Sequence, residues 1–239
     1  MKRALVTGGS GGIGAAICRR LAADGCYVYV HANLNLAKAA ALAEEISAMG
    51  GGAEPIAFDV TDAEATRVVL DALIEESPIQ ILVNNAGLHD DAIFPGMSAI
   101  QWHKVLDVSL NGFFHVTQPL MMPMIRSRWG RIVNITSITG LTGNRGQVNY
   151  AAAKGGLHAA TKSLSLELAS RGITVNAVAP GIIQTGMIEG IFDEKAIAAM
   201  VPMNRAGTPA EVADLVGFLA SEQAGYITGQ IISVNGGMI

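Results

Sequence analysis

The chain alternates short apolar runs with longer amphipathic segments. The apolar runs are bounded by turn residues and lie at 4–7, 27–30, 56–58, 79–83, 131–135, 174–177 and 231–234. Such runs are typical of strands that are buried on both faces of a parallel sheet. Between them, apolar residues recur at three- and four-residue spacing, which predicts helices at 13–23, 36–49, 63–76 and 150–170. The alternation predicts an α/β fold, a single-domain Rossmann-like doubly wound parallel sheet with helices on both faces, over residues 1–239.

One segment, 188–209, departs from this alternation. A strand end there gives way to a helical patch and then to Pro202, Gly207 and Pro209. In so regular a scaffold, a long irregular insertion near the carboxyl end of a strand is usually functional. We therefore expect this segment to be a substrate lid.

Composition narrows the class of protein. Of the 239 residues, 50% are hydrophobic and 15% are charged, which favours a folded chain that could also bury surface in an oligomer. The net charge of −4 speaks against broad nucleic-acid binding, and no apolar run is long enough to span a membrane. Cys18 and Cys26 form no framework of paired spacings and no secretion signal opens the chain, so we expect a cytoplasmic protein. We predict no metal site.

The first predicted strand leads into a glycine-rich turn, Gly8-Gly9-Ser10-Gly11-Gly12-Ile13-Gly14, and then into a helix. Glycines let the backbone turn tightly and let a pyrophosphate approach the helix N-terminus, where free N–H groups and the helix dipole favour an anion. The alternative is a tight strand-to-helix connection without a ligand. The turn predicts a dinucleotide site once the other features are added.

The end of the second predicted strand bears on the choice of dinucleotide. Sites that prefer NAD place an acidic residue there to bind the ribose 2′-hydroxyl, whereas this strand ends in His31-Ala32-Asn33. An uncharged pocket with hydrogen-bond donors favours a 2′-phosphate and hence NADP(H), with His31 and Asn33 as candidate contacts. They could equally be residues that simply end a strand. No arginine is placed to hold the phosphate, and Gly11 stands where one could be.

Three residues suggest proton-transfer chemistry. Tyr150 and Lys154 are four positions apart on one face of a predicted helix. A neighbouring ammonium favours the phenolate, which would lower the pKa of the tyrosine and make proton transfer accessible. Ser137 follows a strand at the carboxyl edge of the predicted sheet, where its hydroxyl could bind a substrate carbonyl. Singly, the three could be an interface aromatic, a solvated charge and a turn residue.

Together these segments resemble the short-chain dehydrogenase/reductase family over essentially the whole chain. Its glycine pattern is present as Thr7, Gly8, Gly12 and Gly14, and its Asn-Asn-Ala-Gly motif is present at 84–87. Its catalytic tetrad is matched by Asn111, Ser137, Tyr150 and Lys154, and its turn beneath the nicotinamide is matched by Pro180-Gly181.

The resemblance implies a role for each of these residues. Tyr150 would donate the proton, Ser137 would position the carbonyl, Lys154 would bind the nicotinamide ribose and lower the pKa of Tyr150, and Asn111 would hold a water of the proton relay. Asp59 and Val60 would flank the adenine, and Ile183 would contact the nicotinamide end. With the residues above, the expected cofactor contacts are Gly8, Ser10, Gly11, Gly12, Ile13, Gly14, His31, Asn33, Asp59, Val60, Asn85, Ala86, Gly87, Tyr150, Lys154, Pro180, Gly181 and Ile183.

Within the family, the chain is most similar to the 3-oxoacyl-[acyl-carrier-protein] reductases, through the stretches 146–154, 170–176, 226–230 and 234–237. That likeness implies NADPH-dependent reduction of a 3-oxoacyl thioester to the 3-hydroxyacyl form, in fatty-acid or specialised polyketide- or polyene-type synthesis. It also implies a homotetramer and docking of an acidic acyl-carrier protein through basic residues near the site entrance. Arg128 and Arg171 match those docking positions, although they could be two solvated arginines.

Two segments depart from the pattern of that group. Thr185-Gly186-Met187 has glycine where an acid is frequent, and Leu88-His89-Asp90-Asp91 differs from the usual sequence after Ala-Gly. These departures are consistent with a member that serves a specialised acyl pathway, such as polyketide- or polyene-type synthesis. Two further alternatives stay open beside the main interpretation. One is an NAD(P)-dependent alcohol or sugar dehydrogenase of the same family. The other is a non-enzymatic cofactor-binding subunit, which the presence of both Tyr150 and Lys154 disfavours.

Overall fold

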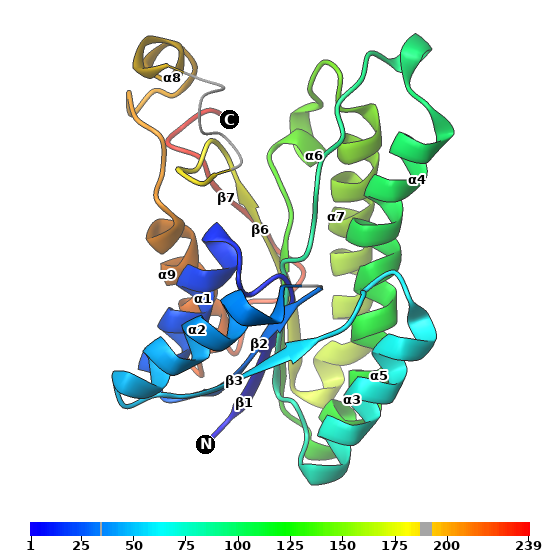
Figure 1. The fold of residues 1–239 in the computed structure, drawn as a ribbon, viewed down its shortest axis with the longest axis vertical. Coiled ribbons are helices and arrows are strands. Elements are labelled where there is room, and N and C mark those ends of the chain that lie inside the picture. The colour runs from blue at the N-terminus through cyan, green and yellow to red at the C-terminus, as the bar shows by residue number, and fades with distance from the viewer. Residues whose placement is uncertain (34, 187–192) are drawn as a thin grey trace.

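The described residues of the computed structural model, 1–33, 35–186 and 193–239, build a seven-stranded sheet flanked by helices (Figure 1). All of its strand pairs are parallel, in the order β3-β2-β1-β4-β5-β6-β7. The strand order reverses between β1 and β4, and ligands bind at such a point in doubly wound folds. The strands are β1 (Arg3–Val6), β2 (Tyr27–Ala32), β3 (Gly52–Ala57), β4 (Ile81–Asn84), β5 (Gly130–Ile135), β6 (Ile173–Pro180) and β7 (Ile231–Val234).

The strands are apolar on both faces because helices cover both. Leu5, Leu82 and Ile132 belong to one buried cluster, whereas the next residue of each strand belongs to the other. The predicted strand positions hold, but β3 begins at Gly52, four residues before the predicted run. The start of β3 was not predicted because Glu54 and Pro55 interrupt the apolar run. Among the described strands β3 pairs only with β2, and an edge strand tolerates a proline that a central strand would not.

Two helical layers enclose the sheet, and the predicted fold class is confirmed (Figure 1). One layer contains α1 (Gly12–Ala23), α2 (Leu36–Ala48) and α9 (Pro209–Ala220). The other contains α3 (Ala63–Glu76), α5 (Gly112–Ser127) and α7 (Val148–Leu168). The shorter helices are η1 (Phe94–Gly96), α4 (Ala99–Leu106), η2 (Asp107–Asn111), α6 (Thr139–Thr142), η3 (Ala169–Arg171) and α8 (Glu194–Met200). None of the helices described here is both long and apolar enough to cross a membrane.

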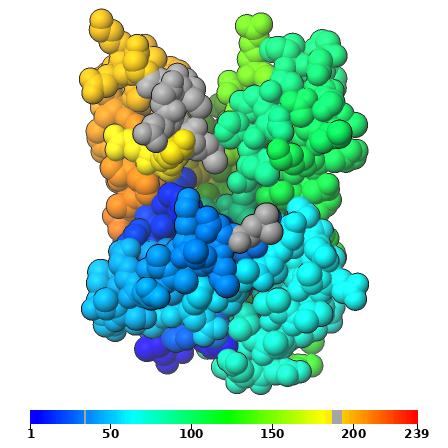
Figure 2. All heavy atoms as spheres, in the orientation of Figure 1, coloured from blue at the N-terminus to red at the C-terminus, as the bar shows by residue number. Residues whose placement is uncertain are grey.

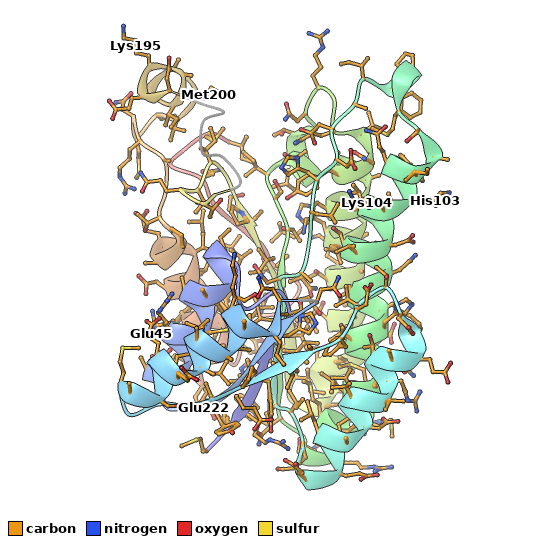
Figure 3. The ribbon with its side chains drawn as sticks, viewed as in Figure 1. Glu45, His103, Lys104, Lys195, Met200 and Glu222 are labelled. Carbon is orange, nitrogen blue, oxygen red and sulfur yellow. The ribbon has the colours of Figure 1, made fainter. Side chains whose placement is uncertain are left out.

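The first part of the expected lid, 188–192, lies outside the described residues. The rest contains α8, which carries Lys195 and Met200 at one end of the molecule (Figure 3), and the loop that leads to α9. A parallel bridge between Ile183 and Gly207 ties this loop back to the carboxyl end of β6. Figure 2 shows a hollow between this part of the chain and the part around α4 and α6. The described part of the segment therefore borders the opening at the carboxyl edge of the sheet.

A chain of buried polar side chains fixes α7 to the sheet. Asn84 on β4 donates to Thr117 on α5 at 3.0 Å and to Asn134 on β5 at 2.9 Å. Asn134 in turn donates to the hydroxyl of Thr161 on α7 at 2.9 Å. Asn134 and Thr161 are completely buried. Because buried amides are costly when unpaired, this network allows few other placements of α7.

Replacing Asn134 with alanine should lower the free energy of unfolding by about 2–4 kcal/mol, because it leaves the amide of Asn84 and the hydroxyl of Thr161 short of partners. Urea denaturation followed by circular dichroism measures this loss. The matched control is Asn144→Ala at an exposed asparagine, which should cost less than about 0.5 kcal/mol. Equal losses in the two variants would show that the network does not hold α7.

Candidate active site

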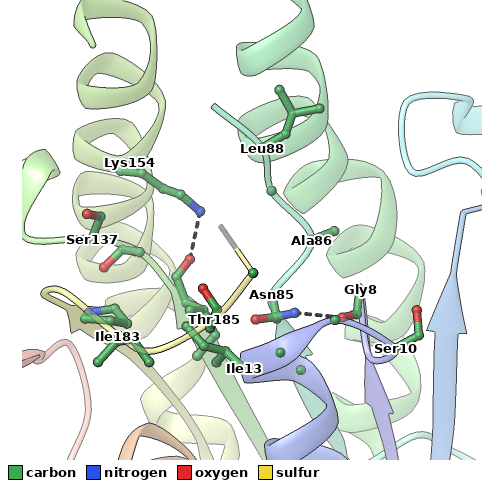
Figure 4. A pocket seen from close by; sticks show the side chains of 18 of the residues that line it. Gly8, Ser10, Ile13, Asn85, Ala86, Leu88, Ser137, Lys154, Ile183 and Thr185 are labelled. Carbon is green, nitrogen blue, oxygen red and sulfur yellow. Dashed lines mark hydrogen bonds between the residues drawn. The ribbon is translucent and has the colours of Figure 1, made fainter. Parts of the chain in front are cut away.

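A cavity of about 500 Å³ opens at the carboxyl ends of the strands, where the strand order reverses. Its walls come from the turn after β1, the end of β2, the segment after β4, the end of β5, the start of α7 and the segment after β6 (Figure 4). Its volume is in the range of small-molecule and cofactor sites. The lining residues are Gly8, Ser10, Gly11, Gly12, Ile13, Gly14, Ala32, Asn33, Asn85, Ala86, Gly87, Leu88, Ile135, Thr136, Ser137, Tyr150, Lys154, Pro180, Gly181, Ile183, Thr185 and Gly186.

The glycine-rich turn fits a phosphate group. A Cβ atom on Gly14 would lie 2.2 Å from the carbonyl oxygen of Gly8, and one on Gly12 would lie 2.9 Å from Cγ2 of Thr185. Gly8 also has a φ of 61°, which disfavours a side chain. The first turn of α1 contains no acidic residue, and its N–H groups have no partners within the helix. The N-terminus of α1 can therefore receive an anion without a competing carboxylate.

Thr7 and Asn85 anchor this turn to β4. The Thr7 hydroxyl accepts the N–H groups of Asn85 and Ala86, both at 3.0 Å. The Asn85 amide donates to the carbonyl oxygen of Thr7 at 2.9 Å and to that of Gly8 at 3.0 Å, the second of which Figure 4 shows. Asn85 thus lines the cavity and also holds the turn in place. Thr7, which the sequence marks only as part of the glycine motif, joins the two loops through its hydroxyl.

His31 does not line the cavity, in contrast to its predicted cofactor contact. It is buried, its Nδ1 accepts the N–H of Gly8 at 3.0 Å, and its Nε2 faces the carbonyl oxygen of Phe58 at 2.9 Å. This arrangement requires the neutral ring with the proton on Nε2. Burial lowers the pKa of His31 to about 4. His31 therefore supports the glycine turn from behind, whereas Asn33 does line the cavity.

The predicted adenine contacts, Asp59 and Val60, do not line the cavity either. The Asp59 carboxylate accepts the backbone N–H and the hydroxyl of Thr61, at 2.9 and 2.8 Å. Val60 is buried, and its side chain packs closely against Gly112, where a Cβ atom would lie 3.0 Å from Val60 Cγ2. Both residues therefore shape the loop after β3, and their contact with an adenine remains a prediction.

Ser137, Tyr150 and Lys154 lie on the same wall of the cavity. Lys154 is buried, and its Nζ donates to the carbonyl oxygen of Ile135 at 3.0 Å, as Figure 4 shows. The same nitrogen lies 5.6 Å from the centre of the Tyr150 ring. Burial lowers the pKa of Lys154 to about 8, so the amine is mostly charged at neutral pH. The spacing of four residues brings the two side chains together, as expected.

The pKa of Tyr150 differs from the expectation. Burial raises it above the ordinary value, the nearby Ser137 hydroxyl opposes this rise, and the charge of Asp91 adds to it. The prediction that Lys154 lowers the pKa of Tyr150 is wrong for the protein without a bound cofactor. The Lys154 ammonium donates instead to the carbonyl oxygen of Ile135. Tyr150 is consequently a protonated phenol at neutral pH. That state suits a group that gives a proton to a carbonyl oxygen.

Asn111 is not brought to the other three members of the expected tetrad. Its side chain is exposed and donates to the Asp107 carboxylate at 2.7 Å, and it does not line the cavity. With Phe114 and Met122, it belongs to the exposed stripe of η2 and α5. The cause is η2, a π-helical turn that rotates the positions after it relative to a regular helix. Residue counting could not show this rotation.

Arg128 and Arg171 are adjacent, but far from the cavity of their own chain. Arg128 ends α5 and its guanidinium donates to the carbonyl oxygen of Ser170 at 3.2 Å. Both arginines precede the amino ends of β5 and β6, whereas the cavity lies at the carboxyl ends. The expectation that they lie near the entrance is therefore wrong within one chain.

Several lining residues were not among the expected contacts. Leu88 and Thr185 stand on opposite sides of the opening in Figure 4. The others are Ala32, Ile135, Thr136 and Gly186. They follow the ends of predicted strands, which is the one signal that could have identified them. In the parts of the chain described, no three His, Cys, Asp or Glu side chains gather closely enough to hold a metal ion.

Comparison with known proteins agrees with this geometry. A family model described as enoyl-(acyl carrier protein) reductase matches residues 8–239. The chain belongs to the short-chain dehydrogenase/reductase family of oxidoreductases.

Individual relatives point to more than one substrate. A 3-oxoacyl-[acyl-carrier-protein] reductase FabG from Aggregatibacter actinomycetemcomitans is 46% identical over 236 residues, which cover 98% of each chain. Nodulation protein G from Azospirillum brasilense is 45% identical and is covered over 98% of its length, with 99% of this chain matched. A putative gluconate dehydrogenase from Agrobacterium tumefaciens has a similar solved structure, with a TM-score of 0.96, 33% identity, and coverage of 99% of this chain and 95% of that one.

The role of His31 predicts a pH dependence of stability. Its pKa falls from 6.5 to about 4 on folding, so the unfolded chain binds more protons between these values and stability is lost as the pH falls from 6.5 toward 4. The loss should reach up to about 3 kcal/mol. His31→Asn retains an acceptor for the Gly8 N–H but does not titrate. Urea denaturation from pH 7 to pH 4.5 should give a flatter profile for this variant, and parallel profiles would contradict the assignment.

Proposed function

We propose that the protein reduces the ketone of a 3-oxoacyl thioester, carried by an acyl-carrier protein, to the 3-hydroxyacyl form with NADPH. The observation that carries the proposal is the partly buried, protonated Tyr150 beside Ser137 and Lys154, across the cavity from the N-terminus of α1. The bound nicotinamide would supply a hydride to the carbonyl carbon. Tyr150 would give its phenolic proton to the carbonyl oxygen, and Ser137 would hold that oxygen by a hydrogen bond. Two relatives, each 46% identical to this chain, are named 3-oxoacyl-[acyl-carrier-protein] reductases.

The end of the cavity next to β2 supports NADP(H). Ser10 and Asn33 line it with a hydroxyl and an amide, and no carboxylate lines the described cavity. A ribose 2′-phosphate would therefore meet hydrogen-bond donors and no negative charge. The N–H groups of the α1 N-terminus, next to Gly11, would add to this attraction.

A second candidate is oxidation of a sugar or sugar acid by the same residues. His89 lies edge-on to Tyr150, with ring centres 6.5 Å apart, and its Nδ1 is 3.0 Å from the Asp91 carboxylate. A polar pair next to the proton donor suits a substrate with several hydroxyl groups. The similarity to a putative gluconate dehydrogenase structure points the same way.

The purified protein should oxidise NADPH when acetoacetyl-coenzyme A is added, with a kcat/KM at least about ten-fold above that for NADH, equivalent to about 1.4 kcal/mol. Absorbance at the reduced nicotinamide band measures both rates. Tyr150→Phe should lower kcat by a factor of about 10² to 10⁴ and leave NADPH binding intact, because only the donated proton is lost.

Three results would count against the proposal. Turnover of gluconate with an oxidised nicotinamide, and none of the thioester, would favour the second candidate. A preference for NADH would overturn the cofactor assignment. An unchanged rate in Tyr150→Phe would mean that the proton comes from another group.

We also propose that the protein is a cytoplasmic homotetramer in which the two arginines serve a neighbouring subunit. Phe114 and Met122 on α5 and Leu166 on α7 are large, apolar and exposed, which suits a subunit interface. A twofold axis across α5, which is about 24 Å long, would pair two such helices antiparallel. Arg128, at the end of α5, would then approach the cavity end of the partner. An acidic carrier docked on Arg128 and Arg171 could thus deliver its thioester there.

The double variant Arg128→Glu/Arg171→Glu should raise KM for an acyl-carrier-protein substrate by about ten-fold or more, because it reverses the charge offered to the acidic carrier. KM for a small acetoacetyl thioester of N-acetylcysteamine should not change. Steady-state kinetics with both substrates measure the difference, and Arg67→Glu on α3 is the control for an exposed charge reversal. An equal effect on the two substrates would exclude carrier docking at this pair.

A further inference from the structure

Ser109 stands out among the buried polar groups near the site. It is the central residue of η2, its side chain is 3% exposed, and its hydroxyl has no hydrogen-bond partner among the described residues. A buried hydroxyl without a partner costs free energy, and native structures commonly satisfy such a group with an ordered water molecule. A π-helical turn is itself frequent at functional sites. We therefore expect the Ser109 hydroxyl to form a hydrogen bond with a bound molecule, such as water.

Ser109 Oγ and Lys154 Nζ both lie next to the space that a side chain at Gly87 would occupy. A Cβ atom built on Gly87 would lie 3.5 Å from Ser109 Oγ and 3.1 Å from Lys154 Nζ. Because Gly87 has no side chain, this space stays open next to both polar atoms. The close approach of η2 to α7 has a second cause at Gly156, where a Cβ would lie 3.3 Å from the Leu110 side chain.

Lys154 has capacity left for a further partner. An ammonium carries three donors, and the structure gives Nζ one acceptor, the carbonyl oxygen of Ile135. Ser109 Oγ can both accept and donate. A water molecule between the two atoms would satisfy the hydroxyl and give the buried ammonium a second acceptor.

We propose that Ser109, and not Asn111, holds a water molecule against Lys154 and so makes the path by which the proton lost from Tyr150 is replaced. After the Tyr150 phenol has given its proton to the substrate oxygen, the phenolate must take one back. Lys154 is the charged donor on that side, and the ordered water would return a proton to Lys154 from solvent. No net charge is lost in this sequence. Ser109 is thus a positioning residue, which acts through the water and Lys154.

This inference rests on the proposed proton transfer by Tyr150, and not on the identity of the acyl substrate. It can therefore be tested with whichever carbonyl compound the wild-type protein reduces. Failure of the wild type to reduce acetoacetyl-coenzyme A would count against the proposed substrate alone. Failure of the Ser109 variants to change the reaction would count against the inference alone.

Ser109→Ala should lower kcat by about ten-fold or more and leave KM for NADPH unchanged, because the relay is slowed and the cofactor cavity is untouched. Ser109→Thr keeps the hydroxyl and should restore most of kcat. The matched control is Thr174→Val, which removes another buried hydroxyl without a described partner, on β6 away from the cavity. The control should keep the wild-type kcat.

The pH profile separates this role from a structural one. The titratable groups recorded around Lys154 are Tyr150 and His158, both on α7. Loss of a water that accepts from the ammonium disfavours its charged form, so the basic limb of the kcat profile should move to lower pH in Ser109→Ala. In Thr174→Val the limb should stay in place.

A crystal structure gives a readout that does not depend on activity. In the wild type, one water should lie within about 3.2 Å of both Ser109 Oγ and Lys154 Nζ, and it should be missing in Ser109→Ala. The inference is overturned if no such water is present, if Ser109→Ala keeps the wild-type kcat and pH profile, or if Asn111→Ala lowers kcat more than Ser109→Ala does.

Discussion

The burial of the Lys154 ammonium constrains the whole site. Transfer of a charged amine to an apolar interior is costly, and here it lowers the pKa of Lys154 to about 8. The charged form is stabilised because the ammonium donates a hydrogen bond of 3.0 Å to the carbonyl oxygen of Ile135, the last residue of β5. That contact in turn needs α7 to be held at a fixed height against the sheet, which the buried hydrogen bond from Asn134 to Thr161 provides. The chemistry of the cavity thus depends on a polar network beneath it, inside the core.

The same burial gives Tyr150 and Lys154 opposite properties. Lys154 is fully buried and Tyr150 is partly buried, so the neutral form of each is favoured: the pKa of the phenol rises and that of the amine falls. At neutral pH the phenol keeps its proton and the amine keeps most of its charge. A pair in this state is ready to donate a proton to a carbonyl oxygen, as the proposed reduction requires. The Ser137 hydroxyl partly opposes the rise at Tyr150 and so keeps the phenol from being too weak an acid.

Much of this arrangement could be predicted from the sequence because it follows from local rules. The glycine turn, the helix from 63 to 76 and the pairing of Tyr150 with Lys154 depend on residues that are close along the chain. The errors have tertiary causes. A histidine at a strand end can face a cavity or the loop behind it, and only packing against Phe58 turns His31 inward. Strand β3 tolerates Pro55 because it lies at the sheet edge, a position that no periodicity reveals.

The π turn at η2 shows how one local irregularity changes the assignment of a function. Five residues, Asp107–Asn111, form that turn between α4 and α5. In this turn Ser109 is buried next to the space that Lys154 also borders, whereas Asn111 lies on the surface and donates to Asp107. An asparagine that matches a motif by its place in the sequence can therefore belong to the exposed face of a helix, while a serine two positions earlier is buried close to the reacting groups. Because the carboxyl edge of the sheet and the start of α7 are fixed by the core, the direction of this turn decides which side chain can reach the buried ammonium.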